Sequence, residues 1–348
     1  MARNALYRFC FLTVTAGMLP GASTITGPVA GYAVASSGPE LRAIFGVPGS
    51  YRFSDPLPLP DGVTRIHITP GQDFALVERG DAGLGILFLS GGTVDRVAAV
   101  DGAMATADWV AFSPRARSAI LFSSSAHRLQ VLSGLPDGPR LVMDLDATNL
   151  PERPVVGGLS DDSQVLLVAS RRAVYRIPPD GATQLLLSAE EIVSLAILRN
   201  GTDAVVAERR TGPVLGTRHP GRDTREDLAV KERGTGSVHL LQNITSTPTT
   251  RELASGWEGI GELYPSSDGG TIFVARPGAK AVSSIDVPSG EVQSLDSDVL
   301  PISLQPLRNR DTFLISAEPH QPGWIFYRDA NAGRVVFIPA VKVSEVER

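Results

Sequence analysis

The chain has few of the residues from which reactive sites are most often built. Its 348 residues include one cysteine, Cys10, and five histidines at scattered positions. It contains no His-x-His or His-Glu-x-x-His pair, no Gly-x-Ser-x-Gly elbow and no Gly-Lys-Ser/Thr phosphate loop. The signatures of histidine-held zinc, elbow-type esterases and P-loop nucleotide binding are therefore missing. We predict no catalytic residue, no metal ligand and no cofactor.

An excess of basic charge is also missing. Lysine and arginine together number 32 against 37 aspartates and glutamates, which gives a net charge of −5. Sequence-independent binding to a phosphate backbone depends on clustered positive charge. The composition therefore argues against a nucleic-acid partner.

Long apolar runs are absent beyond the N-terminus. There, Arg3 and Arg8 precede the apolar run Phe9–Leu19, and Pro20-Gly21 ends that run before small residues follow. This order is typical of a secretory signal peptide. No second run of about 18 apolar residues exists, so we expect no membrane span once the signal is removed.

Two cleavage points fit the small residues that follow the apolar run. One lies after Ala22 or Ser23, and the other lies after Ala35. We assign 1–35 to a signal peptide and small-residue leader, and expect an exported protein, periplasmic or extracellular. Cleavage would remove Cys10 and with it any disulfide or thiol chemistry. An uncleaved N-terminal anchor is the alternative.

Turn-forming residues between short apolar runs are abundant. The chain has 35 glycines and 26 prolines, and 43% of its residues are hydrophobic. The runs have strand length and no helical period, which predicts an all-β fold. Six of them recur in one register after a polar turn: FALVER from Phe74, AILFSS from Ala119, VLLVAS from Val165, AVVAER from Ala204, TIFVAR from Thr271 and TFLISA from Thr312.

The spacing of these six runs predicts a repeat fold. Their last residues are 45, 46, 39, 67 and 41 residues apart, a period typical of four-stranded propeller blades. We predict one β-propeller domain over 36–340, with an insertion loop at 211–236 and a C-terminal tail at 341–348. Six blades are favoured and seven are the alternative. The strand pair expected at 41–57 would close the ring by adding a strand to the last blade, or would belong to a seventh blade.

One stretch resembles a known repeat. In SSDGGTIFVARPGAKAVSSIDVPSGEVQSL (Ser266–Leu295) a turn at Ser267–Gly269, a strand at Ile272–Ala275, a strand at Val282–Asp286 and a turn at Ser289–Glu291 follow in order. This order resembles the repeat of bacterial YVTN-type, WD-repeat-like β-propeller proteins, closely in this fifth unit and loosely elsewhere. The resemblance implies a propeller fold and an exported setting. It implies no catalytic site, because that repeat is structural and accompanies many functions.

Candidate binding residues follow from the shared register. The position that ends the second strand of each unit is Arg79, Ser124, Ser170, Arg209, Arg276 and Ala317, and Arg171 and Arg210 follow two of these. Equivalent positions of a propeller lie on one face, so several guanidiniums could bind carboxylates or phosphates there. The alternative is a set of solvated loop arginines, some of them paired with Glu78 and Glu208.

Aromatic and polar side chains supply the other candidates. Trp109, Trp257 and Trp324 lie near loops, where they would anchor a partner or fill gaps between blades. The binding candidates are Arg79, Arg171, Arg209, Arg210, Arg276, Trp257 and His320. On innermost strands, the candidates for a site in the central channel are His67, Glu262 and Gln305, which could instead be structural residues that bind water.

These observations favour a non-catalytic function without deciding whether the protein is an enzyme. We expect an exported, monomeric propeller that binds a protein, peptide or glycan through loops on one face of the ring. The alternative is a hydrolase or lyase of the gluconolactonase type, with ligands converging on calcium or another divalent cation at the central axis. A purely structural envelope module is a third alternative.

Overall fold

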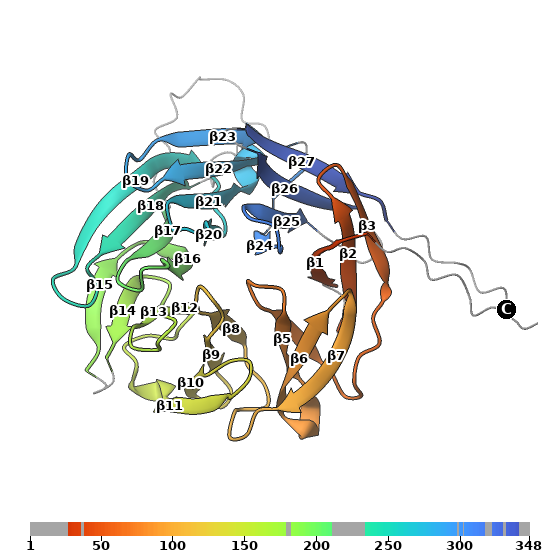
Figure 1. Cartoon of the computed structure of the whole chain (residues 1–348). Helices are drawn as coiled ribbons and strands as arrows, with labels where there is room; N and C mark the ends of the chain where they lie inside the picture. The colour runs from red at the N-terminus through yellow and green to blue at the C-terminus, as the bar shows by residue number, and fades with distance from the viewer. Residues whose placement is uncertain are drawn as a thin grey trace, which may run out of the picture.

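The protein is a ring of antiparallel β-sheets. Its computed structural model describes residues 27–35, 38–178, 182–210, 234–297, 299–301, 303–316, 322–329 and 332–340. These residues form seven sheets, six of four strands and one of three. Figure 1 shows the sheets around a common centre, with the first strand of each sheet nearest to it. The prediction of a propeller with four-stranded blades is confirmed.

Three four-stranded sheets follow the N-terminal segment. The first contains β4 (Arg65–Ile68), β5 (Phe74–Glu78), β6 (Leu84–Ser90) and β7 (Thr93–Ala99). The second contains β8 (Trp109–Phe112), β9 (Ser118–Ser123), β10 (Arg128–Ser133) and β11 (Arg140–Asp146). The third contains β12 (Val156–Leu159), β13 (Leu166–Ala169), β14 (Ala173–Ile177) and β15 (Gln184–Ser188).

Three more four-stranded sheets complete the C-terminal half. The fourth contains β16 (Glu191–Ile197), β17 (Ala204–Arg210), β18 (Thr235–Gln242) and β19 (Thr249–Glu258). The fifth contains β20 (Leu263–Pro265), β21 (Thr271–Arg276), β22 (Ala281–Asp286) and β23 (Val292–Asp296). The sixth contains β24 (Gln305–Pro306), β25 (Thr312–Ser316), β26 (Gly323–Asp329) and β27 (Ala332–Ile338). Short 3-10 turns occur at η1 (Gly80–Ala82), η2 (Ala147–Asn149) and η3 (Pro277–Ala279).

The three-stranded sheet corrects the predicted blade number. Its strands are β1 (Val29–Val34), β2 (Leu41–Val47) and β3 (Ser50–Pro56). The expectation of six blades is wrong, and so is the expectation that the N-terminal segment adds a strand to the last blade, because β24–β27 pair only among themselves. The physical reason is β1: its residues, VAGYAV, are mostly small and resemble the leader, so the sequence pattern indicates only the pair β2–β3.

Apolar clusters fill the spaces between neighbouring sheets. Between the second and third sheets, for example, Phe122 and Leu129 pack with Leu159 and Leu166. Corresponding clusters join each of the other neighbouring pairs, and the N-terminal sheet shares one cluster with β4–β7 and another with β24–β27. Each sheet is therefore covered on both faces, which explains why its inner strands are continuous apolar runs.

One turn recurs between the first and second strands of the four-stranded sheets. A backbone N–H donates to the C=O five residues later, starting at Thr69, Ser113, Ser160, Leu198, Ser266 and Leu307. In five of these turns the fourth residue has a positive φ: Gln72, Ala116, Ser163, Gly201 and Gly269. Glycine adopts this left-handed conformation without steric cost. The Asp-Gly turn of the resembled repeat is thus replaced by other residues in three of the five.

The alternation of strand direction places two kinds of connection on one edge of the ring. The connections between second and third strands share an edge with the connections that lead into first strands. Arg79, Arg171, Arg210 and Arg276 lie in or beside second–third connections. We call this edge the arginine face. The opposite edge carries the first–second and third–fourth connections.

Several predicted segments lie outside the described residues. They are 1–26 of the leader, 211–233 of the insertion loop and the tail at 341–348. Within the portion of the chain that the structure describes, no helix has the length and apolar character needed to cross a membrane.

Candidate functional site

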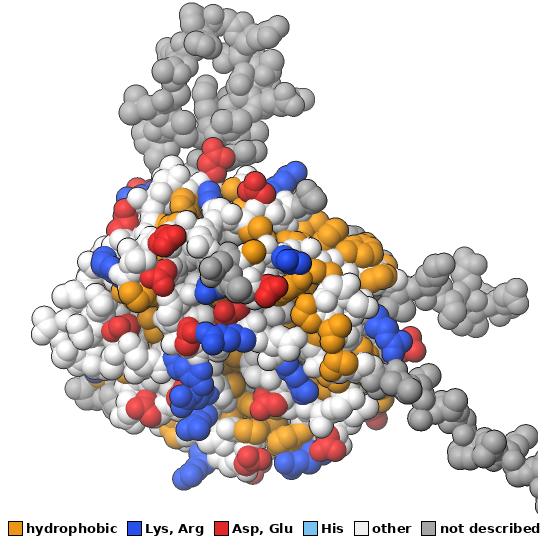
Figure 2. All heavy atoms as spheres, turned by 45° about the horizontal axis from the view of Figure 1, so that its top comes forward, with side chains coloured by type: hydrophobic (Ala, Val, Ile, Leu, Met, Phe, Trp, Pro, Cys, Tyr) orange, Lys and Arg blue, Asp and Glu red, His pale blue; other side chains and the backbone are white. Residues whose placement is uncertain are grey.

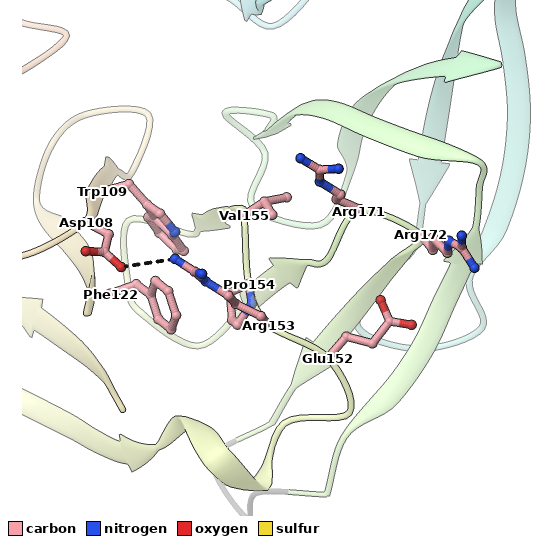
Figure 3. A pocket seen from close by; sticks show the side chains of 9 residues that line it. All are labelled: Asp108, Trp109, Phe122, Glu152, Arg153, Pro154, Val155, Arg171 and Arg172. Carbon is pink, nitrogen blue, oxygen red and sulfur yellow. Dashed lines mark ion pairs between the residues drawn. The ribbon is translucent and has the colours of Figure 1, made fainter. Parts of the chain in front are cut away.

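An open pocket lies on the arginine face between the second and third four-stranded sheets (Figure 3). It has a volume of about 790 Å³ and is lined by Asp108, Trp109, Phe122, Glu152, Arg153, Pro154, Val155, Arg171 and Arg172. These residues come from the start of β8, the end of β9, the connection between η2 and β12, and the β13–β14 turn. Its volume is in the range of sites that hold small ligands or peptide side chains.

One guanidinium in the pocket has a carboxylate partner. Arg153 Nη2 lies 3.6 Å from Asp108 Oδ2 and donates to the Ser124 hydroxyl at 3.1 Å. The Ser124 N–H donates to Asp108 at 2.9 Å. Hydrogen bonds from Ser124 hold the pKa of Asp108 below its ordinary value, and Arg153 and Arg65 lower it further. Asp108 is therefore an anion at neutral pH and holds Arg153 at the pocket wall.

Two further guanidiniums have no carboxylate partner among the described residues. Arg171 and Arg172 are exposed at the tip of the β13–β14 turn, and Figure 3 marks only the Arg153–Asp108 ion pair among the lining residues. The Ser170 hydroxyl accepts from the Arg172 N–H at 3.2 Å. The N–H groups of Ile192 and Ala189 donate to the C=O groups of Arg171 and Arg172 at 2.6 and 2.8 Å. The backbone is thus held from two sides while the charged ends stay free.

Trp109 and Phe122 form an aromatic wall beside these cations. Their ring centroids are 5.5 Å apart and their planes differ by 27°. Gly157 in β12 leaves room for the indole, because a Cβ there would lie 2.9 Å from Trp109 Cη2. The buried indole N–H has no acceptor among the described residues. Val155, 40% exposed, adds apolar surface at the pocket mouth.

The pocket carries a local excess of positive charge. Three guanidiniums face two carboxylates, Asp108 and Glu152, whereas the whole chain has a net charge of −5. Figure 2 shows basic and acidic side chains interspersed over one view of the surface, with hydrophobic side chains gathered toward its right side. Attraction of an anion to the pocket is therefore short-ranged and weakened by salt.

Of the predicted binding residues, Arg171 alone lines the pocket. Arg209 donates to Glu191 at 3.1 Å and Arg210 donates to Glu208 at 3.1 Å. Both pairs lie within the fourth sheet, on β16 and β17. These two guanidiniums are therefore compensated by carboxylates of the protein, and the predicted arginines do not gather at one point.

Arg276 lies over Trp257 instead of reaching toward the pocket. Its Cζ is 4.6 Å from the centre of the indole ring, and its Nη1 donates to the hydroxyls of Ser283 and Ser294 at 3.4 and 3.3 Å. Burial lowers the pKa of Arg276, although Glu258 and Asp296 oppose this. Since Trp257 is only 9% exposed, the pair ties the end of β21 to the end of β19.

Arg79 occupies the position equivalent to Arg276. Each of the two precedes a 3-10 turn, and each has a buried Nε without a partner among the described residues. Arg79 donates to the C=O of Ala82 at 3.2 Å. His320 lies outside the described residues.

The predicted channel residues lie on or next to innermost strands and bind within the protein. His67 Nε2 is 3.1 Å from Glu78 Oε1. Gln305 donates to the C=O of Tyr32 at 2.7 Å, which joins β24 to β1. In the described residues no group of three His, Cys, Asp or Glu side chains converges in a way that could hold a metal ion.

Glu262 is the third channel candidate. It accepts a hydrogen bond from the Leu304 N–H at 2.9 Å. Water reaches its side chain, but protein groups surround it closely, and this desolvation raises the pKa of Glu262 despite the bond from Leu304. Burial also raises the pKa of Tyr264, and the nearby Glu262 adds to that shift. Glu262 is therefore a partly desolvated carboxyl at the start of an innermost strand.

Two buried carboxylates recur near the ends of second strands. Glu78 and Glu208 are 2% and 4% exposed. Glu78 accepts from the Ala107 N–H at 3.2 Å, and Glu208 accepts from the Glu190 N–H at 3.3 Å. His239 Nε2 also lies 2.8 Å from Glu208 Oε2. Both carboxylates thus anchor a connection that leads into a first strand, a structural role on the arginine face.

The sequence prediction missed most of the pocket lining. Arg171 was a binding candidate and Trp109 a possible anchor, but Asp108 and the stretch 152–155 were not singled out. Those residues belong to connections that lead into first strands. These residues could have been identified from the sequence, because the connections into first strands share an edge of the ring with the second–third turns that carry the predicted arginines.

Sequence comparisons assign no family to the chain. No protein-family model matches it, and no curated protein matches it. The narrower assignment to YVTN-type repeats therefore stays a prediction.

Solved structures do match, and they are β-propellers. A functionally unknown protein from Desulfotomaculum acetoxidans is 16% identical with a TM-score of 0.56, over 89% of this chain and 94% of that chain. A Lactobacillus plantarum protein is 13% identical with a TM-score of 0.55, over 90% and 96%. Hydrazine synthase of Kuenenia stuttgartiensis is 11% identical with a TM-score of 0.52, over 93% and 99%. At such identities the similarity shows the fold alone.

Proposed function

We propose that this protein is an exported β-propeller that binds a protein, peptide or glycan partner at the pocket on the arginine face. The observation that carries the proposal is the pair Arg171 and Arg172, whose backbone is fixed while both guanidiniums are exposed and unpaired among the described residues. Aromatic and arginine side chains beside a concave surface are the usual anchors of a binding site.

The lining residues have separable roles in this proposal. Arg171 and Arg172 supply donors for an acceptor-rich ligand. Trp109, stacked on Phe122, supplies apolar contact area at small entropic cost. Arg153 is held by Asp108 and borders the site.

Capture from the native envelope fraction tests the proposal with a matched control. The double variant Arg171→Ala/Arg172→Ala removes two exposed cations from the pocket. The control Arg117→Ala/Arg140→Ala removes two exposed cations from the opposite edge of the second sheet. We expect a partner that the wild type and the control retain and the pocket variant loses. Retention of the same proteins by all three would contradict the proposal.

Export is supported by the N-terminal charge and hydrophobicity pattern. Cleavage after Ala22 or Ser23 would keep β1, whereas cleavage after Ala35 would remove it. Since Tyr32 of β1 is 0% exposed, loss of this strand would leave a large apolar surface uncovered. We therefore propose the earlier cleavage point.

Mass spectrometry of the protein isolated from its host locates the mature N-terminus. We expect it at Ser23 or Thr24. An intact Met1 on a protein recovered from the cytoplasm would contradict export, and a mature chain that starts at Ser36 would contradict the role given to β1.

A further inference from the structure

We infer that the ligand of this pocket is an acidic peptide segment, with carboxylates bound by Arg171 and Arg172, whose side chains point in different directions (Figure 3), and a neighbouring apolar side chain placed against Trp109 and Val155. This inference rests on the proposed function, because it specifies the partner of the same site.

The carboxylate follows from the unequal state of the three guanidiniums. Arg153 is paired with Asp108, whose depressed pKa keeps it ionised. Arg171 and Arg172 are adjacent in sequence, exposed and unpaired among the described residues. Guanidiniums carry only donors and match carboxylate geometry in a bidentate manner. Arg171 and Arg172 are therefore available to bind an anion with two acceptor oxygens.

The neighbouring apolar side chain follows from the pocket wall. Trp109 is partly exposed and backed by Phe122, and Val155 is 40% exposed beside it. Pro154 is buried and cannot shift easily, because its ring fixes the local backbone. In Figure 3 these side chains lie between Asp108 and Arg171. An apolar group next to the carboxylate would thus be stabilised by removing this apolar surface from water.

A peptide fits this donor set better than a glycan does. Sugar hydroxyls both donate and accept, so their recognition needs protein acceptors as well as donors. Among the side chains that line the pocket the acceptors are two carboxylates, Glu152 and Asp108, and Oδ2 of Asp108 already accepts from the Ser124 N–H and lies 3.6 Å from Arg153. A peptide offers acceptors in its backbone C=O groups and in Asp or Glu side chains.

Selection from a random peptide library tests the inference without assuming a sequence. The library is selected on the wild type, and enriched peptides are then titrated against Arg171→Ala/Arg172→Ala and against the control Arg117→Ala/Arg140→Ala. Circular dichroism melting of all three proteins confirms that they fold. We expect enriched peptides to combine Asp or Glu with an apolar neighbour, and to bind the pocket variant at least about tenfold more weakly, or about 1.4 kcal/mol. Binding should also weaken as salt is raised.

The possible outcomes separate the inference from the proposed function. Enriched peptides that lack acidic residues but still depend on Arg171 and Arg172 would overturn the inference and leave the proposed function intact. The same holds if no peptide is enriched but an oligogalacturonate binds in a pocket-dependent way. Peptides that bind the pocket variant as tightly as the wild type, or an absence of any pocket-dependent ligand, would overturn both.

Discussion

The contact between Arg276 and Trp257 gives a predicted ligand-binding residue a structural role. We expect the two side chains to stabilise the fold jointly, because cation–π pairs contribute about 0.5–2 kcal/mol. A double-mutant cycle of Arg276→Met and Trp257→Leu, followed by urea unfolding, should give a coupling energy in that range of about 0.5–2 kcal/mol. A coupling near zero would mean that Arg276 is free in solution, as its loop position alone suggests.

The buried carboxylate of Glu208 should make stability depend on acid. Burial alone would raise the pKa of Glu208, but hydrogen bonds from Arg210, the Glu190 N–H and His239 outweigh it and hold the pKa below its ordinary value of 4.5. A folded-state pKa below the unfolded value gives stability that is present above pH 4.5 and lost as the pH falls through the folded pKa.

The substitution Glu208→Gln tests this linkage. It should lower the free energy of unfolding at pH 7 by about 1–3 kcal/mol and flatten the loss of stability below pH 4.5. Urea unfolding over a pH series measures both effects. Glu291→Gln, at an exposed position, is the control and should change little. Identical pH profiles for the wild type and Glu208→Gln would rule out this role of Glu208.

At the residue scale, the sequence predicts which face carries the arginines and, of their partners, Glu208 for Arg210. Arg209, Arg210 and Arg276 have the same loop register as Arg171, yet only Arg171 lines the pocket. Glu208 precedes its partner Arg210 by two residues in β17, whereas Glu191 and Trp257 approach Arg209 and Arg276 from other strands. Periodicity carries no information about these tertiary contacts.

At the scale of single elements, the recurring first–second turn explains why serine is frequent between the apolar runs of the chain. The hydroxyls of Ser113, Ser160 and Ser266 each accept the N–H of the residue five positions later, at 3.1, 3.0 and 3.0 Å. Ser266 also donates to Asp268 at 2.6 Å. The SSDGG motif is therefore accounted for by turn geometry, without a ligand.

Ser266→Ala should lower the free energy of unfolding by about 0.5–2 kcal/mol, because the buried Thr271 N–H loses one acceptor. Ser267→Ala is the matched control, since Ser267 is exposed and its hydroxyl makes no hydrogen bond among the described residues. Thermal or urea unfolding of the two variants measures the difference. Equal stability of both would show that the hydroxyl bond has no role in the turn.

Most strands could be predicted because they are apolar runs bounded by polar turns. The runs FALVER and TIFVAR coincide with β5 and β21 to within a residue. The exception is β1, whose Ala30, Tyr32 and Ala33 are buried although the segment is short and rich in small residues. Its strand pairing comes from β2, which no local pattern of β1 reveals.

For the whole molecule, Gln72 is the residue that connects the N-terminal sheet to its surroundings. It is 0% exposed. Its Oε1 accepts from the Tyr32 N–H at 2.6 Å, and its Nε2 donates to the Pro306 C=O at 2.6 Å. One side chain thus links β1, the turn between β4 and β5, and β24.

Gln72→Ala should lower the free energy of unfolding by about 2–4 kcal/mol, because it leaves two buried backbone groups without partners. Gln164→Ala, at an exposed position in the turn before β13, should cost much less. Denaturant unfolding of both variants decides the point. A cost at Gln72 no larger than that at Gln164 would contradict the arrangement of β1 between its neighbouring sheets.

The blade number shows the limit of repeat counting. The repeat period indicates six units because it depends on apolar second strands that follow a similar polar turn in the sequence. The N-terminal sheet has the corresponding backbone hydrogen bond, from the Ala35 N–H to the Glu40 C=O at 2.9 Å, but it has only three strands among the described residues. Repeat counting is equally unable to predict the pocket. It forms where two blades meet, so it depends on which connections become neighbours around the ring.

The most direct test of partner binding at the arginine face is photo-cross-linking in the native host. A photoreactive amino acid replaces Val155 at the pocket mouth, and in a control strain it replaces Asp137, which is exposed on the opposite edge of the ring in the second sheet. The account predicts a higher-mass adduct from position 155 and none from position 137. No adduct from position 155, or equal adducts from both positions, would contradict it.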